Sequence, residues 1–500
     1  MPKFIPRKNP VSDGGNCGLL KRFHSLILFF AISLCGAITI LNAAESNPQN
    51  ILFIIGDDIG LDPLGLYELG PEPPPTPNLD SLAANGVLFS NAWATPLCSP
   101  TRATLLSGRY GFRTGLGYTI TTSTPESGVL STSEFTLPKA LDAGGAAHAH
   151  AAIGKWNLGN TGTGNWDPDN PILHGFDYYA GNLSHTIFPN YFSWEKVVND
   201  ASLNEVTTTS EVYATTDNVN DAISWIGAQN SDPWFLWLAF NAAHSPFHKP
   251  PNELHSYDDL EDPPSGSPVP YYKAMIEAMD TEIGRLLASM EPSVLSNTTI
   301  IFLGDNGTPS QVTEYYDPRR GKFTIYQGGV MVPLIISGPS VVDPGRAVTA
   351  PVNSTDMFAT ILDLAGVDVS ATLPPNVIID SLSMVPYLED PSQPPLRQWV
   401  LSERFLNGSS AEGKTTRSKT HKLIRFTSGI EEFYNLIKDP LELDNLDPGS
   451  LSPFAQSQTT WRTGRSKRQR SNDGCEYRHP LRQRSSNRST RENKSNRRRR

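Results

Sequence analysis

The chain has 500 residues, 38% of them hydrophobic and 18% charged, and this composition supports a substantial core and excludes a wholly disordered protein. The formal charge of −10 is uneven, because residues 461–500 hold 15 of the 41 Lys and Arg residues and 3 of the 51 Asp and Glu residues, which leaves a charge of −22 on the rest. So acidic a body is a poor candidate for nucleic-acid binding, whereas it suits a bound divalent metal ion.

The N-terminal region has the pattern of an export signal. Lys21 and Arg22 precede an apolar run at 26–41, and a stretch of small residues ends in Ala43-Ala44. We therefore predict a signal peptide over residues 1–44 and export to the periplasm, the extracellular space or the secretory pathway. An uncleaved anchor is the alternative, but the run is shorter than the ~20 residues that a membrane span needs, so we expect no stable span.

Two patterns alternate between residue 50 and about residue 340. Apolar runs typical of buried strands lie at 51–56, 234–240, 299–304 and 333–337. Helical patterns lie at 78–85, 213–226 and 271–290. Together with the 42 prolines and 39 glycines, which indicate many loops, this alternation predicts an α/β fold with a central sheet flanked by helices.

Acidic residues follow two of the predicted strands directly. Asp57 and Asp58 come after the first run, and Asp305 comes after 299–304. Ligands of open α/β sheets gather at the carboxyl ends of strands, so we expect these side chains at one edge. Adjacent carboxylates repel each other unless a cation is bound, so these residues are candidate metal ligands. The alternative interpretation is a turn or a helix cap, which is the commoner role of a single Asp.

Cys98 is expected to be unpaired. Of the four cysteines, Cys17 and Cys35 would leave with the signal peptide and Cys475 lies in the basic tail, so no disulfide is expected within the folded body. A free thiol in an exported protein is a liability unless it is buried, bound to metal or chemically converted.

The pattern changes near residue 397. Short strand-like segments at 399–402, 421–426 and 433–437 predict a smaller C-terminal subdomain at 397–450, built on an antiparallel sheet, after a catalytic domain at 45–396. Residues 451–500 are polar and Arg-rich, so we expect a disordered tail. A tether to acidic glycans or membranes is its functional alternative.

The stretch Cys98-Ser99-Pro100-Thr101-Arg102, followed by Leu106-Ser107-Gly108-Arg109, resembles the sulfatase signature C-x-P-S/T-R with L-x-G-R. This resemblance implies an alkaline-phosphatase-like fold and conversion of Cys98 to formylglycine by a dedicated activating enzyme. A small buried thiol at the start of a helix is the alternative interpretation.

Sulfate ester chemistry explains why such a nucleophile is useful. The ester is an unreactive anion, so its hydrolysis requires cations around its oxygens and an oxygen nucleophile of lowered pKa. A hydrated aldehyde carries a second hydroxyl group, which can collapse to the aldehyde and expel sulfate without attack by water.

The resemblance also implies the remaining site residues. Four protein ligands and the converted Cys98 would hold Ca²⁺, with Mg²⁺ as the alternative: Asp57, Asp58, Asp305 and Asn306. The other roles fall to Arg102 beside the converted side chain, Lys155 and Lys322 on the sulfate, and His244 on the leaving group. The alternatives are a surface role for Lys155 and for Arg102 and a structural role for His244.

Two positions depart from the family pattern. Asn157 stands where the family usually has a histidine that assists collapse, and a carboxamide has no basic lone pair near pH 7. Another base is then needed for fast turnover; His148 and His150 lie upstream on one strand face, where a structural role is the alternative. Gln327 replaces a glutamate after Lys322.

We therefore predict a sulfatase that acts on a sulfated small molecule or glycan. A phosphate or phosphonate monoester hydrolase on the same fold is the nearest alternative. A catalytically weak homologue that binds sulfated glycans is a second alternative, motivated by Asn157.

Overall fold

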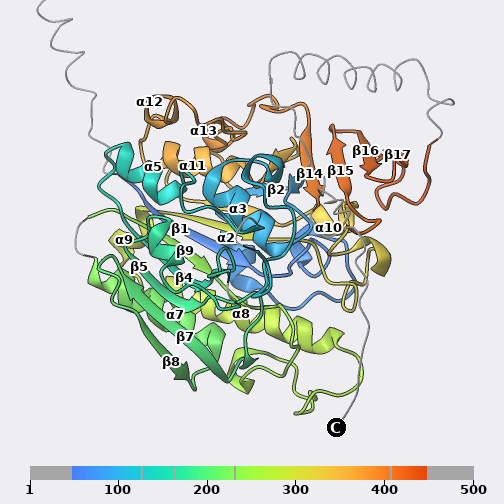
Figure 1. Ribbon diagram of the computed structural model, residues 1–500. Coiled ribbons are helices and arrows are strands. Elements are labelled where there is room, and N and C mark those ends of the chain that lie inside the picture. Colours follow the sequence, from blue (N-terminus) through green and yellow to red (C-terminus); the bar gives the residue numbers. More distant parts are fainter. Residues whose placement is uncertain (1–47, 126–127, 163, 230–231, 406–407, 447–500) are drawn as a thin grey trace, which may run out of the picture. The chain divides into compact units, whose positions relative to one another are not determined.

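The computed structural model of the protein describes residues 48–125, 128–162, 164–229, 232–405 and 408–446 (Figure 1). The predicted signal peptide, the predicted tail and Cys17, Cys35 and Cys475 lie outside the described residues. The chain divides into two units at residue 443, and the description below concerns the first. Within the described ranges, no helix combines the length and the apolarity that crossing a membrane requires.

An eleven-stranded sheet forms the centre of this unit (Figure 1). Its inner parallel strands are, in spatial order, β10 (Thr298–Gly304), β1 (Asn50–Gly56), β9 (Trp234–Ala239), β4 (Ala149–Lys155) and β5 (Tyr178–Asn182). Beyond β10 come β11 (Leu334–Ser337), β2 (Gly86–Phe89) and β12 (Arg346–Val348). Beyond β5 come β7 (Ser193–Asp200), β6 (Pro189–Asn190) and β8 (Val206–Ser210).

The two faces of the central strand β1 belong to separate cores. Ile51, Phe53 and Ile55 pack into one core and Leu52 and Ile54 into the other, because successive side chains of a strand point to opposite faces. Residues of α3 (Cys98–Ser107), α5 (Leu137–Ala143) and α11 (Asp356–Leu364) belong to the first core. Residues of α2 (Pro77–Ala84), α7 (Ala214–Ala228) and α8 (Val269–Ser289) belong to the second. This layering confirms the predicted fold class.

Shorter elements complete the unit. They are β3 (Ala92–Trp93), α4 (Gly111–Thr114), α6 (Asn170–Leu173), α9 (Pro292–Ser296), α10 (Gln327–Val330), β13 (Val352–Asn353), α12 (Val369–Thr372), α13 (Val385–Glu389) and the 3₁₀ turns η1 (Gly65–Tyr67), η3 (Asn252–Leu254) and η4 (Pro318–Arg320).

A second, antiparallel sheet closes the C-terminal part. It consists of β14 (Val400–Arg404), β15 (Gly413–Arg417), β16 (His421–Phe426) and β17 (Glu431–Asn435), paired in chain order. Ile424 and Tyr434 of this sheet pack with Ile325, which lies three residues after Lys322. The small sheet therefore supports the segment that carries Lys322.

Gly154 allows the carboxyl end of β4 to pass close to β9. Its φ is +94°, and a Cβ atom at this position would overlap the backbone oxygen of Ala239. We expect Gly154→Ala to lower the free energy of unfolding by about 3 kcal/mol, measured by urea titration, because both strain and overlap oppose the added methyl group. Gly227→Ala is the matched control: this helical position has no heavy atom within 4 Å, so stability should rise by about 0.5–1 kcal/mol. Equal stability of the two variants would contradict the argument.

Candidate active site

The carboxyl ends of β1 and β10 bring four polar residues together. Gly56 and Gly304 are partners in the parallel register, so Asp57 and Asp305 follow at the same level. The backbone N–H of Asp58 donates to Oδ1 of Asp305 at 3.1 Å, and Nδ2 of Asn306 donates to Oδ1 of Asp58 at 2.8 Å. All four are at most 2% exposed. The four residues predicted as metal ligands therefore form one cluster.

Three buried cations surround these acids. Lys155, the last residue of β4, pairs with Asp57, and Lys322 pairs with Asp58. Arg102 on α3 donates from Nε and Nη2 to Oδ2 of Asp305 at 3.1 and 2.8 Å. Its Nη1 donates to the backbone oxygen of Lys155 at 2.8 Å. Each carboxylate thus has a cation beside it, as buried charges require.

The cluster shifts the pKa values of its members unequally. Burial and then the charge of Asp57 raise the pKa of Asp305 to about 6. Burial opposes ionisation of Asp58 too, but Lys322 and His244 lower its pKa to about 2. Burial alone would lower the pKa of Lys322, whereas the Asp58 carboxylate raises it. The Asp58–Lys322 pair is therefore ionised, and an added cation would favour the ionised form of Asp305.

Two oxygens of the cluster lack a hydrogen-bond partner. Oδ1 of Asp57 and Oδ1 of Asn306 are both buried and unsatisfied. A buried hydrogen-bond acceptor without a partner lowers the stability of the fold. Carboxylate and amide oxygens are also the ligand atoms that Ca²⁺ and Mg²⁺ prefer. One potential ligand atom from each of Asp57, Asp58 and His244 also lies within 4.8 Å of the others. The residues therefore fit a divalent cation.

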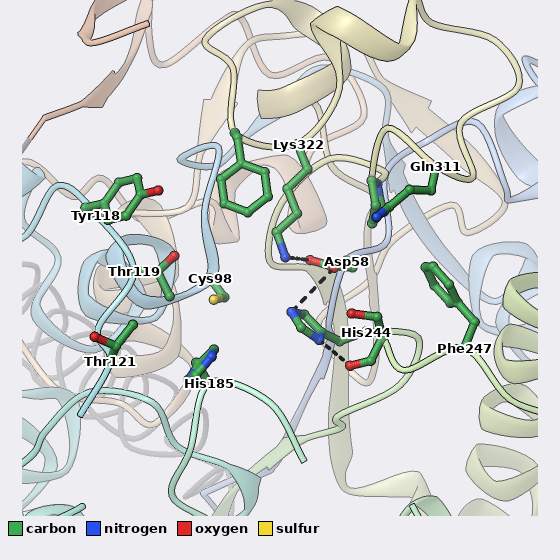
Figure 2. A pocket seen from close by; sticks show the side chains of 13 residues that line it. Asp58, Cys98, Tyr118, Thr119, Thr121, His185, His244, Phe247, Gln311 and Lys322 are labelled. Carbon is green, nitrogen blue, oxygen red and sulfur yellow. Dashed lines mark hydrogen bonds and ion pairs between the residues drawn. The ribbon is translucent and has the colours of Figure 1, made fainter. Parts of the chain in front are cut away.

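Cys98 lies at the start of α3 beside this cluster. It is 1% exposed, and every residue of α3 is buried. Cys98 lines a cavity of about 320 Å³ that also contains Asp58, His244 and Lys322 (Figure 2). The remaining lining residues are His185, Tyr118, Thr119, Thr121, Ser245, Phe247, Pro309, Gln311 and Phe323. An acid, a thiol, an imidazole and an ammonium group thus share one space.

His244 lies in the loop after β9, and its ring lies between the backbone oxygen of Ser245 and the carboxylate of Asp58. Its Nδ1 lies 2.7 Å from the backbone oxygen of Ser245, and its Nε2 lies 3.8 Å from Oδ2 of Asp58. Its side chain is 15% exposed. Burial and then the charge of Lys322 lower the pKa of His244 to about 3, so the ring is neutral at neutral pH. Its Nε2 faces the Asp58 carboxylate within the cavity.

Asn157 forms hydrogen bonds with Cys98 and with its neighbour Ser99. Its Oδ1 accepts from Oγ of Ser99 at 2.6 Å and from Sγ of Cys98 at 3.4 Å, while its Nδ2 donates to the backbone oxygen of Ile120 at 3.1 Å. Its φ is +55°, a left-handed conformation that Asn adopts more readily than most residues. The carboxamide therefore holds the start of α3 in place through hydrogen bonds. It is not basic enough to take up a proton at neutral pH.

The two upstream histidines lie elsewhere. His148 directly precedes β4 and His150 is the second residue of this strand, at the opposite end from Lys155. His150 contacts two carboxylates, with Nε2 3.0 Å from Asp142, and Nε2 of His148 lies 2.9 Å from the backbone oxygen of Gln49. The structure gives both a structural role and places neither in the cavity.

Gln327 also lies away from the cavity lining. Its backbone N–H donates to Oε2 of Glu442 at 2.5 Å, and Glu442 pairs with the buried Lys422 at 2.6 Å. His185, by contrast, is in the cavity although no sequence pattern singled it out. It stands alone in a loop after β5, where neither spacing nor a motif marks it.

Comparison with known proteins gives consistent matches. Residues 49–367 match the Sulfatase family model, and residues 314–454 match the model of the C-terminal region of N-sulphoglucosamine sulphohydrolase. N-acetylgalactosamine-6-sulfatase of Sus scrofa is 30% identical over 443 residues, which cover 82% of this chain and 77% of that protein. Steryl-sulfatase of Homo sapiens is 27% identical over 433 residues, covering 70% and 71%.

Solved structures share the fold. A sulfatase from Pseudoalteromonas sp. superposes with a TM-score of 0.69 at 21% identity, covering 88% of this chain and 94% of its own. A protein solved in complex with its substrate D-glucosamine-2-N,6-O-disulfate has a TM-score of 0.65 at 21% identity, covering 85% and 99%.

The Ser99–Asn157 hydrogen bond can be tested by a double-mutant cycle. We expect Asn157→Ala to lower the free energy of unfolding by about 1–3 kcal/mol, because it leaves buried partners unsatisfied. Ser99→Ala should lower it as well, and the double variant should lose less than the two single losses combined, with a coupling of about 0.5–3 kcal/mol. Additive losses in urea titration would show that the two side chains do not cooperate.

Proposed function

The chain belongs to the sulfatase family and is a sulfuric ester hydrolase, and from this premise we propose that it cleaves a sulfate monoester with a nucleophile made from Cys98 and with a bound divalent ion. One observation supports this proposal most strongly. Cys98 lines the same cavity as Asp58, His244 and Lys322, so the convertible thiol, an acid of the cluster and cationic and imidazole groups converge on a space of about 320 Å³.

We assign sulfate binding to Lys155 and Lys322. Both ammonium groups are buried at the carboxyl edge of the sheet; Lys322 lines the cavity and Lys155 does not, but the charges of both act on the lining residue His185 and would therefore act on an anion bound there. Such charges compensate the negative charge of the sulfate oxygens while the S–O bond breaks.

We assign the metal site to Asp57, Asp58, Asp305, Asn306 and the converted residue 98. The two unsatisfied oxygens of Asp57 and Asn306 support this assignment. When bound, a calcium ion, or magnesium as the alternative, would neutralise negative charge and lower the pKa of the attacking hydroxyl group. Arg102 keeps Asp305 oriented through its two hydrogen bonds.

Formylglycine at position 98 would supply two hydroxyl groups once hydrated, one to attack sulfur and one to restore the aldehyde and release sulfate. Its formation requires an activating enzyme. We assign His244 to the departing oxygen, because Nδ1 is tied to Ser245 and Nε2 is directed toward Asp58 and the cavity; since the ring is neutral, Nε2 must take up a proton before it can protonate that oxygen.

A sulfated sugar is the substrate class that we favour. The relatives include N-acetylgalactosamine-6-sulfatase, and one structural neighbour was solved with a disulfated glucosamine. The cavity rim combines the aromatic rings of Tyr118, Phe247 and Phe323 with polar groups of Thr119 and Gln311, a mixture that suits a sugar ring. We further propose that the protein is exported, since the predicted signal peptide precedes the catalytic part.

Cys98→Ser tests the nucleophile. We expect this variant to lose nearly all sulfate release from an aryl sulfate, because the usual cysteine-dependent conversion needs the thiol, and peptide mass spectrometry of the wild type should show an aldehyde at position 98. Cys475→Ser is the matched control and should keep full activity. Unchanged turnover of Cys98→Ser would refute the assignment.

Calcium binding can be tested independently of activity. We expect Ca²⁺ at about 100 times its dissociation constant to stabilise the protein by about 2.7 kcal/mol, and EDTA to reverse the resulting rise in Tm. Asp57→Asn should weaken this response. Asp62→Asn should keep it, because the buried Asp62 carboxylate is already satisfied by Thr308 and Thr313. A calcium response equal in both variants would place the ion elsewhere.

A further inference from the structure

His185 is an unassigned imidazole in the wall of the cavity. It lines the same cavity as Cys98, His244 and Lys322, as Figure 2 shows. Its Nδ1 atom is buried and has no hydrogen-bond partner, while the ring lies against Trp166 with centroids 6.1 Å apart. A buried ring nitrogen without a partner in a ligand cavity is free to bind a group that enters or forms there.

The other candidates for a proton acceptor near Cys98 are already engaged. Asn157 uses its carboxamide to hold Ser99 and Ile120. His244 is anchored at Ser245 and faces Asp58. His185 and His244 are the two imidazoles among the described residues that line the cavity. His185 is therefore the imidazole of this cavity that has no assigned role and whose Nδ1 lacks a hydrogen-bond partner.

The charge state of His185 suits the same role. Burial, followed by the charges of Lys155 and Lys322, lowers the pKa of His185. The ring is therefore neutral at neutral pH, and one of its nitrogens carries a free lone pair.

We propose that His185 is a catalytic residue that accepts the proton from the free hydroxyl group of residue 98 when sulfate is released. The inference rests on the proposed function, since it requires formylglycine at position 98. His185 takes the hydroxyl proton, and the O–H electron pair becomes the second bond of the aldehyde. The C–O bond to the sulfate group breaks, its electron pair leaves with sulfate, and His185 returns the proton to water.

The test uses wild-type enzyme and His185→Asn, with His185→Gln as a second variant should the first fold poorly. Asn and Gln retain a polar side chain but cannot accept a proton at neutral pH. We expect one equivalent of phenol to be released from an aryl sulfate in a normal burst. Steady-state turnover should then fall by about 100-fold or more, because a missing general base typically costs 10² to 10⁴.

Two further readouts separate proton transfer from a structural role. Peptide mass spectrometry after the burst should show a sulfate group retained on residue 98 in the variants but not in the wild type. Added imidazole should restore turnover to His185→Ala. His255→Asn is the matched control and should behave as wild type, since His255 lies outside the cavity lining and Asn can keep the 3.1 Å bond from the backbone N–H of Tyr257.

Turnover within twofold of wild type in the folded variants would overturn the inference. So would a reduced burst without retained sulfate, which would assign His185 to substrate binding. Failure of the proposed function has a different appearance, because it shows in the wild type itself as a thiol at position 98 or as absence of sulfate release, and it removes the basis of the inference.

Discussion

The site depends on a balance of buried charges at the ends of two paired strands. Because β1 and β10 run parallel in register, Asp57 and Asp305 follow the two strands at the same level, and their carboxylates lie close together. Carboxylates this deeply buried persist only when cations compensate them. Three cations from distant segments provide that compensation: Arg102 from α3, Lys155 from β4 and Lys322 from the loop before α10. Their ion pairs hold these segments against the ends of β1 and β10.

The nucleophile position depends on a second, neutral arrangement. Asn157 connects the start of α3 to Ile120 through Ser99, and its left-handed backbone directs the carboxamide inward. A residue that fixes Cys98 in this way cannot also accept a proton from it. The departure from the family pattern therefore separates positioning from proton transfer, and we assign the second task to His185, which lines the same cavity as residue 98.

The sequence was informative where burial dictates pattern. The runs at 51–56, 234–240 and 299–304 lie within one residue of β1, β9 and β10, because strands buried on both faces read as continuous apolar segments. The strand β15 was not foreseen, since Gly413–Arg417 is mostly polar. Asp57, Asp58 and Asp305 were predictable as neighbours from their strand-end positions. Arg102 and Lys322 were identified through the family resemblance, and His185 was missed because its role depends on a loop path that no local pattern encodes.

The burial of α3 bears on the order of events during biosynthesis. The proposed conversion would require an activating enzyme to bind the chain around residue 98, yet in the finished fold every residue of α3 is buried and Cys98 is 1% exposed. The wall that carries Lys322 rests on Ile424 and Tyr434, residues that leave the ribosome long after Cys98. Because the C-terminal sheet is synthesised last, the wall that carries Lys322 is still incomplete when the Cys98 segment leaves the ribosome, and this is the stage at which we expect the proposed conversion to occur.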